Sequence, residues 1–120
     1  MSSYLLILPV ALLVAYSQVM VKWRAAVLPP QSSLSGQLSA MFADPLILSA
    51  YAAAFAASIA WLLVVTKLPL TIAFPAYIGI TFVMVIAGGH FILGESMPVA
   101  KIVAVTLILS GIALGMSTDA

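Results

Sequence analysis

The stretch from Leu70 to Leu93 most constrains how this chain folds, because it contains no Asp, Glu, Lys or Arg. A helix needs about 20 mainly apolar residues to cross the hydrocarbon core of a bilayer, and this stretch exceeds that length. It also contains Pro75, Gly79 and the pair that begins at Gly88. A membrane helix tolerates such residues where neighbouring helices pack closely on its backbone. We therefore expect a transmembrane helix that lies partly against protein or a cavity, and not wholly against lipid.

The rest of the chain continues the same pattern. Hydrophobic residues make up 65% of the sequence and charged residues 6%, and the mean hydropathy is +1.29, which is typical of an integral membrane protein. Four segments have the length and composition of transmembrane helices, and we place them at residues 4–23, 45–66, 69–93 and 98–117. The predicted fold is all-α: one membrane domain over residues 1–120 with four transmembrane helices. Almost nothing remains for a soluble domain.

The long connection between the first two segments carries signals for a short helix of its own. Pro29 and Pro30 stop the first helix, and Ser32 or Ser33 can cap a new one. Its apolar residues share one side at helical spacing: Leu34, Leu38, Met41 and Phe42. This pattern predicts a short interfacial segment. No basic residue decorates its polar side, so attraction to anionic lipid is not its purpose.

Small residues and a tight turn indicate how the helices pack. Lys67, Leu68 and Pro69 close the second segment and open the third, so we expect these two helices to be antiparallel neighbours. In the second segment small residues and one Trp form a stripe at helical spacing, which favours close helix packing: Ala50, Ala54, Ala57, Ser58 and Trp61. In the fourth segment, Gly111 and Gly115 form a small-xxx-small pattern. That pattern predicts a helix contact, either within the chain or across a dimer.

The sequence lacks the residues that several kinds of catalytic or binding site require. Without Cys there is no disulfide framework, thiolate metal site or thiol nucleophile. No Ser/His/Asp set, metal-ligand cluster or phosphate-binding Gly loop is found, so we expect no enzyme, no catalytic residue, no metal and no cofactor. The net charge of +1 gives no reason to expect a nucleic-acid partner. No Asp, Glu, His, Lys or Arg lies in the central two-thirds of any segment, where a proton-coupled antiporter would require a titratable group. His90 lies near a helix end, where a hydrogen-bonded anchor is the commoner role and a pH-sensitive group the alternative.

One face of the first helix is the most polar transmembrane surface that the sequence predicts. Gln18 and Lys22 lie one turn apart there, on the face shared with Ala11 and Val14. Gln18 suits either a hydrogen bond between helices or a substrate contact. Lys22 and Arg24 commonly snorkel to the interface and set topology, and the functional alternative is that they hold a phosphate.

Three runs of residues resemble the drug/metabolite transporter superfamily, which includes small multidrug resistance proteins and EamA-type repeats. These are PLTIAFP from Pro69 to Pro75, GE at Gly94, and SGIALG ending at Gly115. The resemblance extends over about residues 57–115 and takes in VAYSQVMVK of the first helix. It implies a small-multidrug-resistance-like fold. By the same likeness, Val14 stands where that family has its proton- and drug-binding glutamate, Tyr77 stands at its substrate-stacking aromatic, and Phe74 stands at a tyrosine. Without the glutamate, the family's exchange of drug for protons has no chemical basis in this chain.

A narrower likeness is carried by SQVMVK ending at Lys22 and by WLLV beginning at Trp61, together with PLTIAFP. These runs look like those of the aminoarabinose-phosphoundecaprenol flippase subunits, which also lack the glutamate. The likeness implies translocation of a polyprenyl-phosphate-linked sugar across the bacterial inner membrane. A lipid-linked sugar keeps its tails in the bilayer, so a groove of neutral hydrogen-bonding groups can suffice. Our candidate substrate-binding residues are Tyr16, Ser17, Gln18, Lys22, Arg24, Phe74, Tyr77 and Thr81.

Two other functions stay open: a small-molecule or drug exporter that uses a partner's acidic residue, and a non-transporting assembly protein. Related transporters build their path from two repeats, so we expect a homodimer or a heterodimer with a related four-helix subunit, in contact with membrane lipids. Lys22, Arg24 and Lys101 lie on one side of the membrane and Lys67 on the other. This bias favours both termini outside the cytoplasm and leaves dual insertion open.

Overall fold

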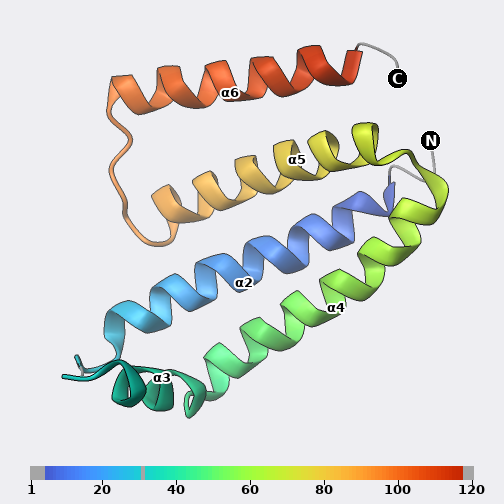
Figure 1. Ribbon diagram of the computed structural model, residues 1–120. Coiled ribbons are helices and arrows are strands. Elements are labelled where there is room, and N and C mark those ends of the chain that lie inside the picture. Colours follow the sequence, from blue (N-terminus) through green and yellow to red (C-terminus); the bar gives the residue numbers. More distant parts are fainter. Residues whose placement is uncertain (1–4, 31, 118–120) are drawn as a thin grey trace.

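The computed structural model describes residues 5–30 and 32–117 and contains helices but no strand within those ranges. Its helices are α2 (Ile7–Val27), α3 (Leu34–Phe42), α4 (Pro45–Lys67), α5 (Leu70–Phe91) and α6 (Val99–Ser117) (Figure 1). All except α3 are long and apolar enough to cross a membrane. This confirms the all-α fold with four transmembrane helices, and the chain is a multi-pass membrane protein.

The first transmembrane helix ends later than predicted. We expected its end at residue 23, but α2 continues to Val27. The charges of Lys22 and Arg24 end the apolar run without ending the helix, because long basic side chains are good helix formers at an interface. The stop comes from Pro29. Leu28 is extended, with φ −73° and ψ 145°, as a residue before proline prefers.

The short helix predicted between the first two transmembrane segments is present as α3. Ser33 is its N-cap, and the Ser33 Oγ accepts a hydrogen bond from the Gly36 backbone N–H at 3.0 Å. No residue of α3 is buried, and the helix lies at one end of the bundle (Figure 1). This end is called the α3 side below. The α3 side also holds Lys22, Arg24, Asp44 and the α5–α6 connection, whereas Lys67 lies at the opposite end.

The four long helices form one splayed layer in the order α4, α2, α5, α6, so that α2 lies between α4 and α5 (Figure 1). The expectation that the second and third transmembrane helices are neighbours was therefore wrong beyond their turn. They diverge because α2 packs into the space between them. The core that holds these three helices consists of Ile7, Val10, Ala57, Val64, Ala73 and Ala76.

Gly88 allows α2 and α5 to approach closely. A Cβ placed on Gly88 would lie 2.7 Å from the Cγ2 atom of Val19, which is closer than carbon atoms can pack. The α6 helix shows the opposite situation. None of its residues is buried, and a Cβ on Gly111 or Gly115 would have no atom within 4 Å. Among the described residues, no neighbouring helix therefore approaches the Cβ position of either glycine.

The α5–α6 connection folds back on the end of α5. Gly94 has a φ of +74°, which glycine adopts readily. This turn lets the Glu95 N–H donate to the Gly89 carbonyl at 2.9 Å. His90 Nδ1 lies 2.9 Å from the Glu95 carbonyl oxygen, so Nδ1 carries the proton in this contact. His90 is thus the hydrogen-bonded anchor that its position near a helix end favoured.

Candidate binding groove

A groove lies where α2, α4 and α5 meet on one broad face of the layer. Its volume is about 270 Å³. We call it the aromatic groove, and its lining consists of Val10, Val14, Ala54, Ala57, Ser58, Trp61, Phe74 and Tyr77. No acidic or basic residue belongs to this described lining. Val14, at the position where the resemblance implies a glutamate in other proteins, faces the groove as an apolar side chain.

Three aromatic rings form one wall of this groove. The Trp61 centroid lies 5.1 Å from that of Tyr77 and 6.3 Å from that of Phe74, and the Phe74 and Tyr77 centroids are 6.0 Å apart. The rings meet because the turn at Leu68 and Pro69 joins the end of α4 to the start of α5. Such tilted and edge-on arrangements are favourable beyond the area they bury. Trp61 therefore acts in helix packing, as predicted, and also exposes part of its ring to the groove.

A row of α2 side chains extends the groove toward the α3 side. Val10, Val14, Gln18 and Lys22 follow one another at four-residue intervals, so they line one face of the helix. Val10 and Val14 line the aromatic groove, while Gln18 and Lys22 are exposed beyond it. The row spans roughly 18 Å along the helix axis. It changes from apolar through neutral and hydrogen-bonding to cationic.

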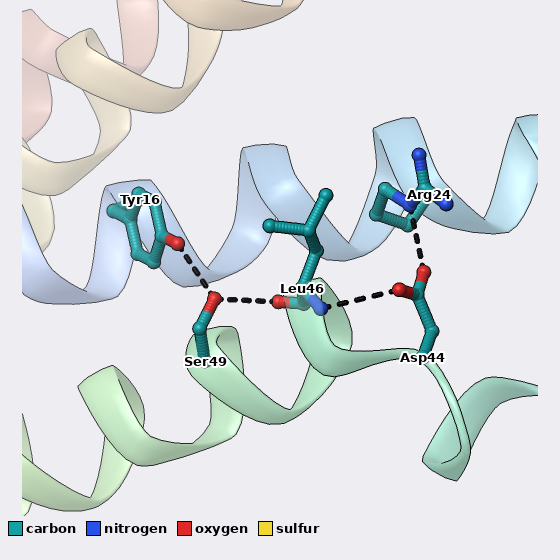
Figure 2. A network of polar contacts seen from close by, with 5 residues as sticks. All are labelled: Tyr16, Arg24, Asp44, Leu46 and Ser49. Atoms are coloured by element: carbon teal, nitrogen blue, oxygen red, sulfur yellow. Dashed lines mark hydrogen bonds and ion pairs between the residues drawn. The ribbon is translucent and has the colours of Figure 1, made fainter.

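Arg24 belongs to a different surface, because it turns toward α4. Its Nε donates to Asp44 Oδ2 at 2.7 Å (Figure 2). The other oxygen of that carboxylate, Oδ1, accepts from the Leu46 N–H at 3.1 Å and caps α4. The hydrogen bond from Arg24 is the main reason why the pKa of Asp44 lies below its ordinary value; the backbone hydrogen bond and the Arg24 charge lower it further, and burial opposes them.

Tyr16 continues this polar link between α2 and α4. Its hydroxyl lies 2.7 Å from Ser49 Oγ, and Ser49 Oγ donates to the Leu46 carbonyl at 2.6 Å (Figure 2). Because the single hydroxyl proton of Ser49 is already used, Tyr16 is the donor to Ser49. We call the set Tyr16, Arg24, Asp44, Leu46 and Ser49 the α2–α4 link.

Ser17 and Thr81, the remaining predicted site residues, are buried in the layer and do not line the aromatic groove. Thr81 Oγ1 has no hydrogen-bond partner within the described residues. Of the predicted site residues, Phe74 and Tyr77 thus line the aromatic groove, Gln18 and Lys22 lie beyond it along the α2 row, and the other four lie elsewhere.

Sequence reasoning did not select Asp44 or Ser49. A signal for Asp44 was present, since Asp before Pro at the start of an apolar run is a typical N-cap. Nothing in the sequence pairs Asp44 with Arg24, because the 20 residues between them must first fold as a turn and α3.

Comparisons with protein families, with curated proteins and with solved structures find no match to this chain.

Proposed function

We propose that this protein is a subunit of a bacterial inner-membrane transporter that moves a polyprenyl-phosphate-linked sugar across the bilayer. The observation that carries this proposal is the α2 row beside the aromatic groove. It offers one cation near the membrane surface, one neutral amide further in, and aromatic rings beyond the amide. The resemblance of PLTIAFP, WLLV and SQVMVK to flippase subunits supports the same reading.

Each part of this face suits one part of such a substrate. At the α3 side, the Lys22 ammonium binds the phosphate as a flexible point charge. Gln18 exchanges hydrogen bonds with sugar hydroxyls as the head group passes, because its amide both donates and accepts. Trp61 and Tyr77 offer flat apolar surface to the sugar ring, and the polyprenyl tail stays in the lipid.

One chain offers this path only in part. The aromatic groove, at about 270 Å³, is smaller than the roughly 300–1,000 Å³ of typical ligand sites. A single layer of four helices also leaves the groove open on its outer side. We therefore propose that a second four-helix subunit, identical or related, closes the path in a small-multidrug-resistance-like arrangement.

The test is translocation of a labelled polyprenyl-phosphate sugar in proteoliposomes. Lys22→Ala should weaken capture by about ten- to hundredfold, since it removes one charge-assisted hydrogen bond of about 1.5–3 kcal/mol. Gln18→Leu should slow passage while insertion into the membrane stays normal. Lys101→Ala is the matched control, because Lys101 is an exposed cation on the same side of the membrane but on α6.

Transport should persist when the proton gradient is collapsed with an uncoupler, because the described lining of the aromatic groove contains no Asp, Glu, His, Lys or Arg. Equal activity of the wild type, Lys22→Ala and Gln18→Leu would remove the α2 row from the mechanism. Strict dependence on the gradient with this chain alone would overturn uncoupled transport.

A second candidate function is export of a flat organic cation, and the aromatic wall favours it. Three electron-rich rings attract such a cation, especially away from water. The counter-charge then has to come from an acidic residue of a partner subunit. Gradient-driven movement of a quaternary ammonium dye, seen only when a related subunit with a buried Glu is present, would select this function over sugar transport.

The positions of the basic residues also predict orientation. Lys22, Arg24 and Lys101 on the α3 side place that side in the cytoplasm, against Lys67 alone on the other. A reporter fused after the last residue should therefore be active outside the cytoplasm, and a reporter found only in the cytoplasm would contradict this orientation.

A further inference from the structure

A second groove runs along the other face of α2, between α2 and α5. It is the larger of the two, with a volume of about 480 Å³. Its lining is apolar apart from one hydroxyl, that of Tyr16, which is bonded to Ser49. Side chains that define it include Leu12, Tyr16, Met20, Trp23, Met84 and Ile92. We call it the lipid groove.

The lipid groove lies across α2 from the row that we assign to transport. Leu12 and Tyr16 each follow a residue of that row, Val10 and Val14, by two positions. Two positions turn a helix by about 200°, so the two sets point in nearly opposite directions. An occupant of this groove would therefore not obstruct the aromatic groove.

The length of the lipid groove matches one leaflet of a bilayer. From Leu12 to Trp23 the α2 axis rises by about 16.5 Å. Half of a hydrocarbon core is about 15 Å thick. Trp23 marks the end at the α3 side, where a Trp ring fits the level of the lipid head groups. One acyl chain of a lipid in this leaflet therefore fits the groove from end to end.

A cation lies at the head-group end of the groove. The Arg24 guanidinium carbon is 5.2 Å from the centroid of the Trp23 ring. The Nε of Arg24 donates a hydrogen bond to Asp44. Within the described residues, the two terminal nitrogens of Arg24 make no hydrogen bond. Figure 2 shows one of the two terminal nitrogens directed away from the carboxylate. The exposed acid of the α5–α6 connection, Glu95, makes no ion pair with Arg24, and its Oε1 lies beside Gly89.

From this geometry we propose that the lipid groove holds one chain of an anionic membrane lipid whose head-group phosphate is bound by the terminal nitrogens of Arg24. A guanidinium fork already fixed by a carboxylate on one edge presents its other nitrogens to a phosphate in a set orientation. Asp44 thus positions Arg24 for the lipid. This site is separate from the transport function proposed above.

The two tryptophans of the chain are natural probes for the test, because Trp23 lines the lipid groove and Trp61 lines the aromatic groove. The protein is placed in phosphatidylcholine vesicles that contain a small fraction of a lipid with brominated chains, which quenches Trp on contact. That lipid is either phosphatidylglycerol or phosphatidylcholine. In the Trp61→Phe variant, brominated phosphatidylglycerol should quench Trp23 with about fivefold higher affinity than brominated phosphatidylcholine, as one basic group at the surface predicts.

Three variants separate a built site from general attraction to a charged surface. Trp23→Phe, in which Trp61 reports, should show no preference between the two lipids. Arg24→Gln removes the cation at the head-group end of the groove, so the preference should fall toward one. Lys101→Gln removes a cation elsewhere on the same side and should leave the preference unchanged.

Equal quenching of Trp23 by both brominated lipids would overturn the proposal. So would a preference that survives Arg24→Gln, or one that Lys101→Gln abolishes, because each would indicate a general surface effect. Sugar translocation that fails while this lipid preference holds would count against the transport function alone.

Discussion

The helices α2 and α6 have opposite places in the layer, and their compositions explain why. The mean hydropathy is 1.3 for α2 and 2.1 for α6, yet α2 is the helix packed on both sides while α6 has no buried residue. In water this order would be reversed, because burial would favour the more apolar helix. In a bilayer the lipid tails solvate an apolar helix, and the polar helix is held among other helices. Three polar groups of α2 are satisfied or covered within the protein: Ser17 is buried, the Tyr16 hydroxyl bonds Ser49, and Arg24 bonds Asp44. Gln18 and Lys22, its other polar side chains, are exposed.

The glycines of α5 and α6 differ in how closely other residues pack on them. Gly88 of α5 is buried because Val19 occupies the space that a side chain would need. Gly111 and Gly115 of α6 have the spacing of a packing motif, but a Cβ on either would meet no atom within 4 Å among the described residues. At these glycines the closest helix approach is thus between α2 and α5, whereas α6 contacts α5 less tightly, with Ile112 Cγ2 3.4 Å from a Cβ placed on Gly79. That the α6 glycines contact a second subunit stays a prediction.

Breaking the α2–α4 link should have the largest effect on stability. In Asp44→Ala, Arg24 loses its acid and α4 loses its N-cap, so the midpoint of unfolding should fall by more than in any variant below. Asp44→Asn keeps an oxygen for the Leu46 N–H and should lie between Asp44→Ala and the wild type. Reversible unfolding in mixed micelles, followed by circular dichroism, gives these midpoints. Glu95→Gln serves as the control for loss of an acid, and an equal loss there would mean that the link is not special.

The same ion pair predicts how stability depends on pH. The pKa of Asp44 is lower in the folded protein than its ordinary value of about 3.9. A group with a lowered pKa contributes stability above its unfolded-state pKa, and the contribution disappears as the pH falls through the folded-state pKa. Stability should therefore be flat from neutral pH to about 4 and fall below that. In Asp44→Asn the acid-side fall should be smaller, and an unchanged fall would assign it to another group.

Disrupting the Gly88 contact should cause the second-largest loss of stability. Gly88→Val adds atoms where a Cβ alone would already lie 2.7 Å from Val19, so α2 and α5 must separate. Overpacking of this kind costs about 1–3 kcal/mol of unfolding free energy. Adding Val19→Ala to the same chain should restore part of that loss, because it removes the colliding methyl groups. If the double variant were no more stable than Gly88→Val alone, the contact with Val19 would not be what requires glycine.

Removing the Tyr16 hydrogen bond should cause the third-largest loss of stability. Tyr16→Phe keeps the ring in place and removes the donor to Ser49. Hydrogen bonds between membrane helices contribute about 0.6 kcal/mol on average, so a loss of that size is expected in the same unfolding assay. Tyr51→Phe is the matched control, since Tyr51 stacks on Phe42 and its hydroxyl has no hydrogen bond within the described part of the chain. A loss as large in Tyr51→Phe would show that the bond to Ser49 contributes nothing.

Local signals in the sequence predicted the elements well, whereas the order of the helices needed the structure. Long apolar segments predicted the number of transmembrane helices, and Ser33 was among the two expected caps of α3. The turn at Pro69 was also correct, but a turn fixes only the ends that it joins. That α2 lies between α4 and α5 depends on contacts between residues far apart in the chain, such as Val19 with Gly88. For the same reason the sequence grouped Arg24 with Lys22, although 100° per residue around α2 directs Arg24 toward Asp44.

Substitutions at Gly111 and Gly115 should have the smallest effect on the unfolding free energy of the single chain. They test directly whether α6, unlike α2, is exposed within one subunit. Replacing both with Leu adds side chains into open space, so unfolding of the isolated chain should stay within about 0.5 kcal/mol of the wild type. Crosslinking in membranes should show loss of the dimer, because bulky residues keep two helix backbones apart. Leu107→Ala is a suitable control for a change of volume on exposed α6 away from the glycines. A normal dimer yield in the Gly111→Leu/Gly115→Leu variant would place the subunit contact elsewhere, and a destabilised single chain would mean that α6 packs more closely on α5 than its exposure indicates.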